Sequence, residues 1–225
     1  MPNLFFGKLE NEKIVLDEDE TKHIKVTRVK EGDTIEITDG KGVRYVCIVE
    51  KIKKREVICG ILEKHIVERD SENKLLAVIP MGRWERLRFL IEKCVELGVD
   101  IIVVHRFKRS QRIYSFEKIF NVVKEASKQC KRYLFPRIRI SEDLNKILEE
   151  NVNYYALDPS GKSIDSIDFQ GNVGIITGPE GGFDEEEKTS LSRRTIFISL
   201  GKKILRFDTA SIIAIGFIAL KKKKI

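Results

Sequence analysis

The chain has 225 residues, which is enough for one large domain, or for a medium and a small domain that each bury a core. A formal net charge of +7 and a pI of about 9.1 favour a polyanionic partner. The cysteines match no zinc-site spacing, the N-terminal residues lack the features of a signal peptide, and no apolar run reaches transmembrane length, so we expect a cytoplasmic protein with reduced thiols.

The first 70 residues have the pattern of short β-strands. Apolar and polar residues alternate in four segments, and glycine-containing turn sequences separate them. A short helix is predicted over 18–26, before the second of these segments. The predicted strands cover 13–16, 34–38, 43–52 and 57–63. This pattern predicts a small β-barrel.

A polar, aperiodic stretch over 68–74 marks the expected domain boundary. Beyond it, apolar runs alternate with longer segments of helical periodicity, which indicates an α/β domain with a mostly parallel sheet. Strands are expected over 75–80, 100–104 and 154–157, and helices over 83–97 and 115–133.

Basic and aromatic residues gather in two segments of this second domain. Basic groups that contact phosphates, together with aromatic rings that stack on unpaired bases, are typical of an RNA-binding face. The cluster consists of Arg106, Lys108, Arg109, Arg112, Lys131, Arg132, Arg137 and Arg139, with Phe107, Tyr114, Tyr133 and Phe135 between them. We expect half of these aromatic residues to belong to the core.

The stretch VGIITGPEGGFDEEE, residues 173–187, combines a buried strand, a glycine-rich turn and a helix start. Its glycines let a ligand approach the backbone closely, and Asp184 with Glu187 forms a capping-box pattern. The stretch matches neither GxxxxGK[ST] nor GxGxxG, and four acidic residues on the first helical turn would repel a phosphate. A positively charged ligand, or a neutral one held by backbone groups, fits better; a tight corner without a ligand is the alternative.

A second strand–glycine–helix corner follows in IFISLGKKILRFDTASIIAIGFIA, residues 196–219, with its turn at Gly201. Two such corners close in sequence are expected side by side at the carboxyl edge of a parallel sheet. That edge is where α/β proteins bind ligands.

These motifs resemble the ribosomal RNA small subunit methyltransferase E family, uridine-N3 methyltransferases of the SPOUT (trefoil-knot) superfamily. The family pattern is GPEGG, then LG, two variable residues, an aliphatic residue, LR, one variable residue, E and TA; here GPEGGF and LGKKILRFDTA match it, with Asp208 where Glu is usual. HIKVTRVKEGDTIEITDGKG resembles the family's PUA-like domain, and Lys93 with ELGV at 96–99 matches a further motif. In KEASKQCKRYLFP, Lys128 stands where Glu is common.

The resemblance spans nearly the whole chain and implies its architecture. It implies a PUA-like β-barrel RNA-binding domain over 1–70, followed by an α/β SPOUT trefoil-knot methyltransferase domain over 71–225. It also implies the cofactor S-adenosylmethionine, and a homodimer in which the apolar C-terminal helix offers a face. The implied cofactor pocket consists of Leu157, Thr177, Gly178, Gly182, Leu200, Gly201, Ile204, Leu205 and Ala210.

For the reaction, Arg206 is the candidate that stabilises the uridine anion, as an oxyanion donor does. Either Glu180 or Asp208 accepts the N3 proton or fixes Arg206; a structural ion pair between Arg206 and Asp208 is the alternative. The RNA-binding candidates are Arg28, Arg109, Arg112, Gln129 and Arg132. The implied partner is 16S rRNA within the assembled small ribosomal subunit.

Two other functions remain open at this point. In the first, the chain has the same fold but methylates a different group, as a SPOUT ribose 2′-O-methyltransferase that acts on rRNA or tRNA. The other is a non-catalytic RNA-binding or ribosome-assembly protein that uses only the barrel and the basic cluster. The intact LGKKILRFDTA loop argues against the second, because a protein without a cofactor does not need two glycine corners.

Overall fold

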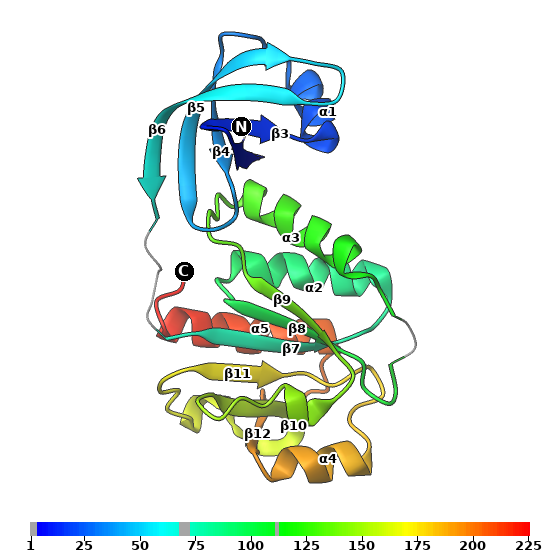
Figure 1. Cartoon of the computed structure of the whole chain (residues 1–225). Coiled ribbons are helices and arrows are strands. Elements are labelled where there is room, and N and C mark those ends of the chain that lie inside the picture. Colours follow the sequence, from blue (N-terminus) through cyan, green and yellow to red (C-terminus); the bar gives the residue numbers. More distant parts are fainter. Residues whose placement is uncertain (1–3, 68–72, 111–112) are drawn as a thin grey trace. The chain divides into compact units, whose positions relative to one another are not determined.

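The structure is a computed structural model that describes residues 4–67, 73–110 and 113–225 (Figure 1). The chain forms two compact units. The first contains residues 1–69 and 124–135, and the second contains residues 70–123 and 136–225. Most of the boundary region predicted over 68–74 lies outside the described residues.

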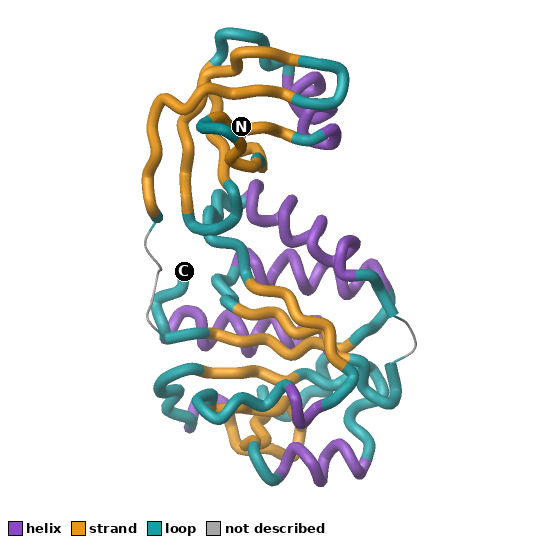
Figure 2. The backbone as a smooth tube through the Cα atoms, viewed as in Figure 1, coloured by secondary structure: helices purple, strands orange, loops and turns teal. Residues whose placement is uncertain are grey.

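The first unit is built on a six-stranded sheet in the order β1-β4-β5-β6-β3-β2. Neighbouring strands are antiparallel, except for the parallel pair β1 and β4. The strands are β1 (Leu4–Phe6), β2 (Lys8–Glu10), β3 (Lys13–Leu16), β4 (Thr34–Thr38), β5 (Val43–Ile52) and β6 (Val57–Ile66). The four predicted strands are present, and β5 and β6 form the long hairpin in Figure 2. The three-residue strands β1 and β2 were not predicted, because they are too short to show alternation.

Helix α1 (Glu18–Thr27) packs on this sheet and contributes Ile24 to its core. The Asp17 carboxylate caps the helix by accepting hydrogen bonds from the backbone N–H groups of Asp19 and Glu20. The helix ends at Arg28, which is in the left-handed conformation with φ of 60°.

The C-terminal half of helix α3 (Phe116–Gln129) and the segment after it belong to the first unit, although the sequence places them in the second domain. A buried charge cluster explains this association. The Glu20 carboxylate is buried and lies 2.7 Å from Lys128 Nζ and 3.8 Å from Lys124 Nζ. Lys128, where the family pattern has Glu, therefore has its counter-charge within this unit.

The second unit contains a six-stranded sheet in the order β12-β10-β11-β7-β8-β9, and every neighbouring pair is parallel. This confirms the predicted α/β class. The strands are β7 (Leu75–Pro80), β8 (Ile101–His105), β9 (Arg137–Ser141), β10 (Asn153–Ser163), β11 (Val173–Ile176) and β12 (Thr195–Ser199). The three central strands β11, β7 and β8 are wholly buried, as parallel strands covered on both faces are.

Three more helices belong to this unit. They are α2 (Trp84–Glu96), α4 (Glu185–Ser192) and α5 (Phe207–Lys221), and short 3₁₀ turns lie at Leu144–Lys146 and Ile164–Ser166. Helix α5 packs against α2, β7 and β11, while α4 lies beside β12 (Figure 1). Gly98, with φ of +73°, follows the end of α2, as the sequence predicted. No helix in the described part of the chain is long and apolar enough to cross a membrane.

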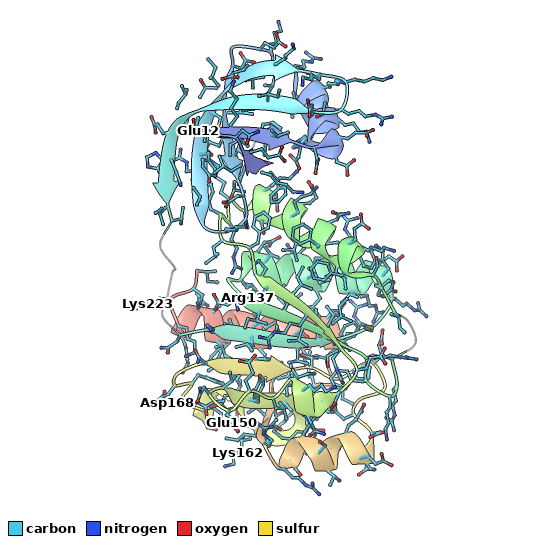
Figure 3. The ribbon with its side chains drawn as sticks, viewed as in Figure 1. Glu12, Arg137, Glu150, Lys162, Asp168 and Lys223 are labelled. Carbon is cyan, nitrogen blue, oxygen red and sulfur yellow. The ribbon has the colours of Figure 1, made fainter. Side chains whose placement is uncertain are left out.

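Two features of the second sheet differ from the prediction. Strand β9 was not predicted. It lies in the basic cluster, where the exposed Arg137 and Arg139 obscure the strand pattern; Arg137 is labelled in Figure 3. Strand β10 is longer than expected because its pairing with β12 breaks after Leu157 and resumes at Lys162. The trefoil knot stays a prediction, because strand order alone does not define how loops thread.

Candidate functional site

A cavity of about 810 Å³ lies at the carboxyl ends of β10, β11 and β12, within the second unit. Its wall includes every residue that the sequence analysis assigned to the cofactor: Leu157, Thr177, Gly178, Gly182, Leu200, Gly201, Ile204, Leu205 and Ala210. The two predicted glycine corners do meet at one edge of the sheet. Their shared cavity has the size typical of small-molecule and cofactor sites.

The first corner is a tight turn after β11. The Gly182 N–H donates to the Pro179 carbonyl at 2.8 Å, and Gly182 has φ of +69°, a conformation that favours glycine. A Cβ atom at Gly178 would lie 3.2 Å from the Phe183 ring. The turn therefore depends on small residues at both positions.

Helix α4 begins with the predicted capping box. Asp184 Oδ1 accepts the Glu187 N–H at 2.7 Å, and Glu187 Oε2 accepts the Asp184 N–H at 2.9 Å. Glu187 is buried, and its other oxygen accepts the Lys108 N–H at 2.7 Å. This carboxylate thus joins the loop after β8 to the glycine-rich turn.

Local groups compensate the acidic charge at this helix start. The backbone N–H of Glu187 and, to a smaller extent, the Lys108 ammonium lower the pKa of the Asp184 carboxyl. Lys108 Nζ lies 3.2 Å from Asp184 Oδ2 and also contacts Glu186. Lys108, a member of the predicted RNA-binding cluster, is therefore engaged with α4.

The second corner positions the start of α5. Gly201 has φ of +120°, and its N–H donates to Ser199 Oγ at 3.2 Å. The buried Ser211 hydroxyl lies 2.8 Å from both Thr177 Oγ1 and the Phe207 carbonyl oxygen. These contacts tie the first turn of α5 to the end of β11, and they hold the two corners together.

Besides the two corners, strand β10 contributes a third part of the cavity wall, and it contains residues that were not predicted. Asp158, Pro159 and Ser160 form the outward bulge of β10 and line the cavity beside Leu157. Burial raises the pKa of the Asp158 carboxyl, but hydrogen bonds from Ser160 and the ammonium of Lys188, 3.3 Å away, outweigh it and leave that pKa below its usual value. The turn sequence Asp-Pro-Ser-Gly was the available signal.

Two of the three candidate catalytic residues, Arg206 and Glu180, line the same cavity, and the third, Asp208, lies beside Arg206 without lining it. Arg206 lines it, its side chain is 69% exposed, and its Nε lies 3.9 Å from Oδ1 of the largely buried Asp208. Glu180 also lines the cavity, but it lies 3.8 Å from Arg86 Nη1. Of the two carboxylates, Asp208 is therefore the one placed to orient Arg206.

The RNA-binding candidates divide between the units. Arg109 lines the cavity and donates from Nη1 to the Gly181 carbonyl, whereas Arg112 lies outside the described residues. Arg28, Gln129 and Arg132 belong to the first unit. The first two are exposed, and Arg132 Nε donates to the Leu134 carbonyl at 2.9 Å.

Comparison with protein families covers most of the chain. Residues 69–219 match the RNA methyltransferase domain family, and residues 16–62 match the RNA methyltransferase PUA domain family. The first range covers most of the parallel-sheet unit with its cavity, together with residues 124–135, and the second covers β4, β5 and most of β6 in the first unit.

Individual proteins are similar over nearly their whole length. A ribosomal RNA small subunit methyltransferase E from Buchnera aphidicola is 30% identical over 226 residues, which cover 94% of this chain and 92% of the relative. A predicted RNA methyltransferase from Thermotoga maritima is 46% identical, with a TM-score of 0.90 and full coverage of both chains. A putative methyltransferase from Legionella pneumophila, solved in complex with the bound cofactor SAM, is 25% identical, with a TM-score of 0.89 and 98% coverage of each chain.

Proposed function

This chain belongs to the ribosomal RNA small subunit methyltransferase E family, and from that premise we propose that it transfers a methyl group from S-adenosylmethionine to N3 of a uridine in 16S rRNA. The observation that carries the proposal is the meeting of both glycine corners and the β10 bulge around one cavity. A protein that only binds RNA does not need a cofactor-sized cavity at these two corners.

The cavity suits the proposed cofactor chemically. Leu157, Ile198 and Leu205 offer apolar walls for the adenine, and the glycine turns expose backbone groups for its polar edge. Three carboxylates that can lie beside a cationic sulfonium, those of Asp158, Glu180 and Glu185, line the cavity together with four basic side chains. When bound, S-adenosylmethionine supplies the methyl group.

In the proposed reaction, Arg206 carries the main chemical role of the protein. Uracil N3 becomes nucleophilic when it loses its proton, and the negative charge then spreads to O2 and O4. The exposed Arg206 guanidinium donates hydrogen bonds to one of these oxygens and so stabilises the anion. Asp208 keeps the guanidinium directed toward the cavity.

We assign the proton acceptor to Glu180. Its side chain is 46% exposed and lines the cavity, whereas Asp208 is 13% exposed and lies beside Arg206. A partly exposed carboxylate can pass the proton on to solvent. We expect the target uracil to be flipped out of the RNA stack into the cavity, where its orientation toward the methyl donor would contribute several kcal/mol.

The proposal extends to partners and location. The outer face of α5 exposes Ile213 and Leu220, 46% and 66% exposed, and we assign this face to a homodimer interface. The substrate we assign is 16S rRNA within the assembled small subunit, where a protein with two RNA-binding units can recognise shape around a short target. We place the protein in the cytoplasm, where its cysteines stay reduced.

The test is a methyl-transfer assay with labelled S-adenosylmethionine and three substrates from a strain that lacks the modification: small subunits, free 16S rRNA and large subunits. We expect label in the RNA of small subunits, less in free 16S rRNA and none in large subunits. Label confined to large subunits would reject the substrate. Cofactor binding without any transfer would reject the proposed activity on ribosomal RNA.

A further inference from the structure

An aromatic pair with a cation over it lies in the second unit, outside the catalytic candidates. The ring centroids of Trp84, at the start of α2, and Tyr114, just before α3, are 5.0 Å apart and their planes are tilted by 50°. The Lys118 ammonium lies 4.0 Å from the centroid of the Trp84 ring and 5.3 Å from that of Tyr114. Both rings are half-buried, and Lys118 is exposed.

Gly82 connects this aromatic pair to the cavity wall. The Tyr114 hydroxyl donates to the Gly82 carbonyl at 3.0 Å. A Cβ atom at Gly82 would lie 3.3 Å from the Phe207 ring and 3.8 Å from Glu180 Oε1, and both of these residues line the cavity. The pair therefore lies next to the part of the cavity wall that holds the proposed proton acceptor.

Three basic residues lie close to the pair in the sequence, next to the acidic residues Glu85 and Glu117. Arg83 is exposed immediately before Trp84, and Arg86 lies two positions after it on the same helix. With the exposed Lys118 they bring three basic groups to this region that can pair with phosphates, and Arg86 Nη1 also lies 3.8 Å from Glu180 Oε1. Proteins that bind single-stranded nucleic acid combine these two kinds of group.

We propose that Trp84 and Tyr114 form a stacking site for the base of an rRNA nucleotide that neighbours the one being methylated. This inference rests on the proposed function. The Lys118 ammonium lies over the ring faces that a base would cover, and its exposed side chain can move to the phosphate of the same nucleotide. Stacking a neighbour at this place would hold the target nucleotide unstacked beside the cavity.

The first measurement uses the intrinsic fluorescence of the protein, because Trp84 is the single tryptophan of the chain. The full-length protein is titrated with a short single-stranded oligouridylate and, separately, with an abasic oligomer that carries the same number of phosphates. We expect the oligouridylate to quench Trp84 and the abasic oligomer to leave its emission almost unchanged. Equal quenching by both oligomers would overturn the stacking site.

The second measurement uses variants in the methyl-transfer assay. Trp84→Leu and Tyr114→Leu should each raise the KM for small subunits by about tenfold, the lower part of the range for loss of base–aromatic stacking, with little change in kcat. Trp84→Phe keeps an aromatic face and should restore most of the affinity. Binding of S-adenosylmethionine, measured by calorimetry, should be unchanged, which also shows that the variants fold.

Phe89→Leu is the matched control, because Phe89 is the second aromatic residue of α2, is itself exposed, and also has a lysine over its ring, Lys93 at 5.4 Å. It should have the KM of the unmodified protein. A Trp84→Leu variant with unchanged KM, or a Phe89→Leu variant with an equal increase, would overturn the inference. Base-dependent quenching in a protein that methylates no ribosomal RNA would instead uphold the stacking site and reject the proposed function.

Discussion

Arg206 occupies a position in which a charged side chain stays free to meet a substrate. It is the N-cap residue of α5 with extended backbone dihedrals of −65° and 151°, and its side chain makes no capping hydrogen bond. Its side chain is 69% exposed, and its Nε lies 3.9 Å from Oδ1 of Asp208. This is looser than a bidentate ion pair, so the geometry favours a functional role over a purely structural one.

Replacing Arg206 tests whether this residue acts in methyl transfer or in cofactor binding. We expect Arg206→Ala to lower kcat by about 10²- to 10³-fold, the effect of removing one oxyanion donor, while S-adenosylmethionine binds with unchanged affinity. Lys203→Ala is the matched control, because Lys203 is another cation of the same loop that lines the cavity; it should keep most of the turnover. Near-normal turnover by Arg206→Ala would show that Arg206 has no catalytic role.

His105, at the end of β8, makes stability depend on pH. Burial lowers the pKa of its imidazole from 6.5 to about 4, against a smaller opposite effect from the Ser141 backbone. The unfolded chain therefore binds this proton more readily than the folded one. The stabilisation is complete above pH 6.5 and is lost as the pH falls toward 4, by about 1.4 kcal/mol per pH unit within that window.

We expect the urea midpoint of the second unit, followed by Trp84 fluorescence, to fall between pH 7 and pH 5. The drop should be much smaller in His105→Gln, whose side chain stays neutral. Asp158 and Asp184, whose pKa values are lowered, lose their stabilisation only below about pH 3.8 and do not contribute in this window. An equal drop in both proteins would contradict the assignment to His105.

At the scale of elements, the site depends on how α4 and α5 begin. The capping box of α4 fixes the glycine-rich turn from one side, and the Ser211 contacts fix the start of α5 from the other. Each helix start thus positions a loop that lines the cavity. Weakening these local contacts should therefore lower the affinity for the cofactor.

Asp184 offers a test of this dependence. Asp184→Ala removes the cap and should destabilise α4 by about 1 kcal/mol. It should also weaken binding of S-adenosylmethionine, because the preceding turn loses its anchor. Asp184→Asn can still accept the Glu187 N–H and should bind the cofactor nearly as well as the unmodified protein. Calorimetry that finds the same affinity for Ala and Asn variants would contradict this account.

The sequence predicted the features that depend on residues close to one another in the chain, and it did not predict those that depend on long-range pairing. Four of the six strands in the first unit, the capping box and both glycine corners follow from alternation, turn residues and helix-start rules, and they are present in the structure. The bulge at Asp158 depends on the pairing of β10 with β12 across the sheet, which no local pattern contains. Residues 124–135 join the first unit through the charge pair of Lys128 with Glu20, 108 positions apart.

At the scale of the whole molecule, charge and exposed apolar surface indicate the partners. The net charge of +7 supports binding to a polyanion, and the affinity for RNA should fall steeply as salt rises. The exposed apolar face of α5 supports self-association. The two properties can be tested separately, because one depends on salt and the other on a single apolar face.

For the homodimer, we expect sedimentation of the unmodified protein at micromolar concentration to give twice the mass of one chain. Ile213→Asp places a charge on the exposed face of α5 and should shift the protein to monomer. Leu62→Asp, at an exposed apolar residue of β6 in the first unit, is the control and should remain dimeric. A monomer in the unmodified protein would exclude the dimer.

The identity of the methylated nucleoside tests the central claim most directly. Small subunits methylated by the purified protein are digested to nucleosides, and the labelled product is identified by mass spectrometry against authentic standards. We expect 3-methyluridine from 16S rRNA, and loss of that product with Arg206→Ala. A 2′-O-methylated nucleoside would contradict the proposed uridine-N3 chemistry while leaving the cofactor site in place.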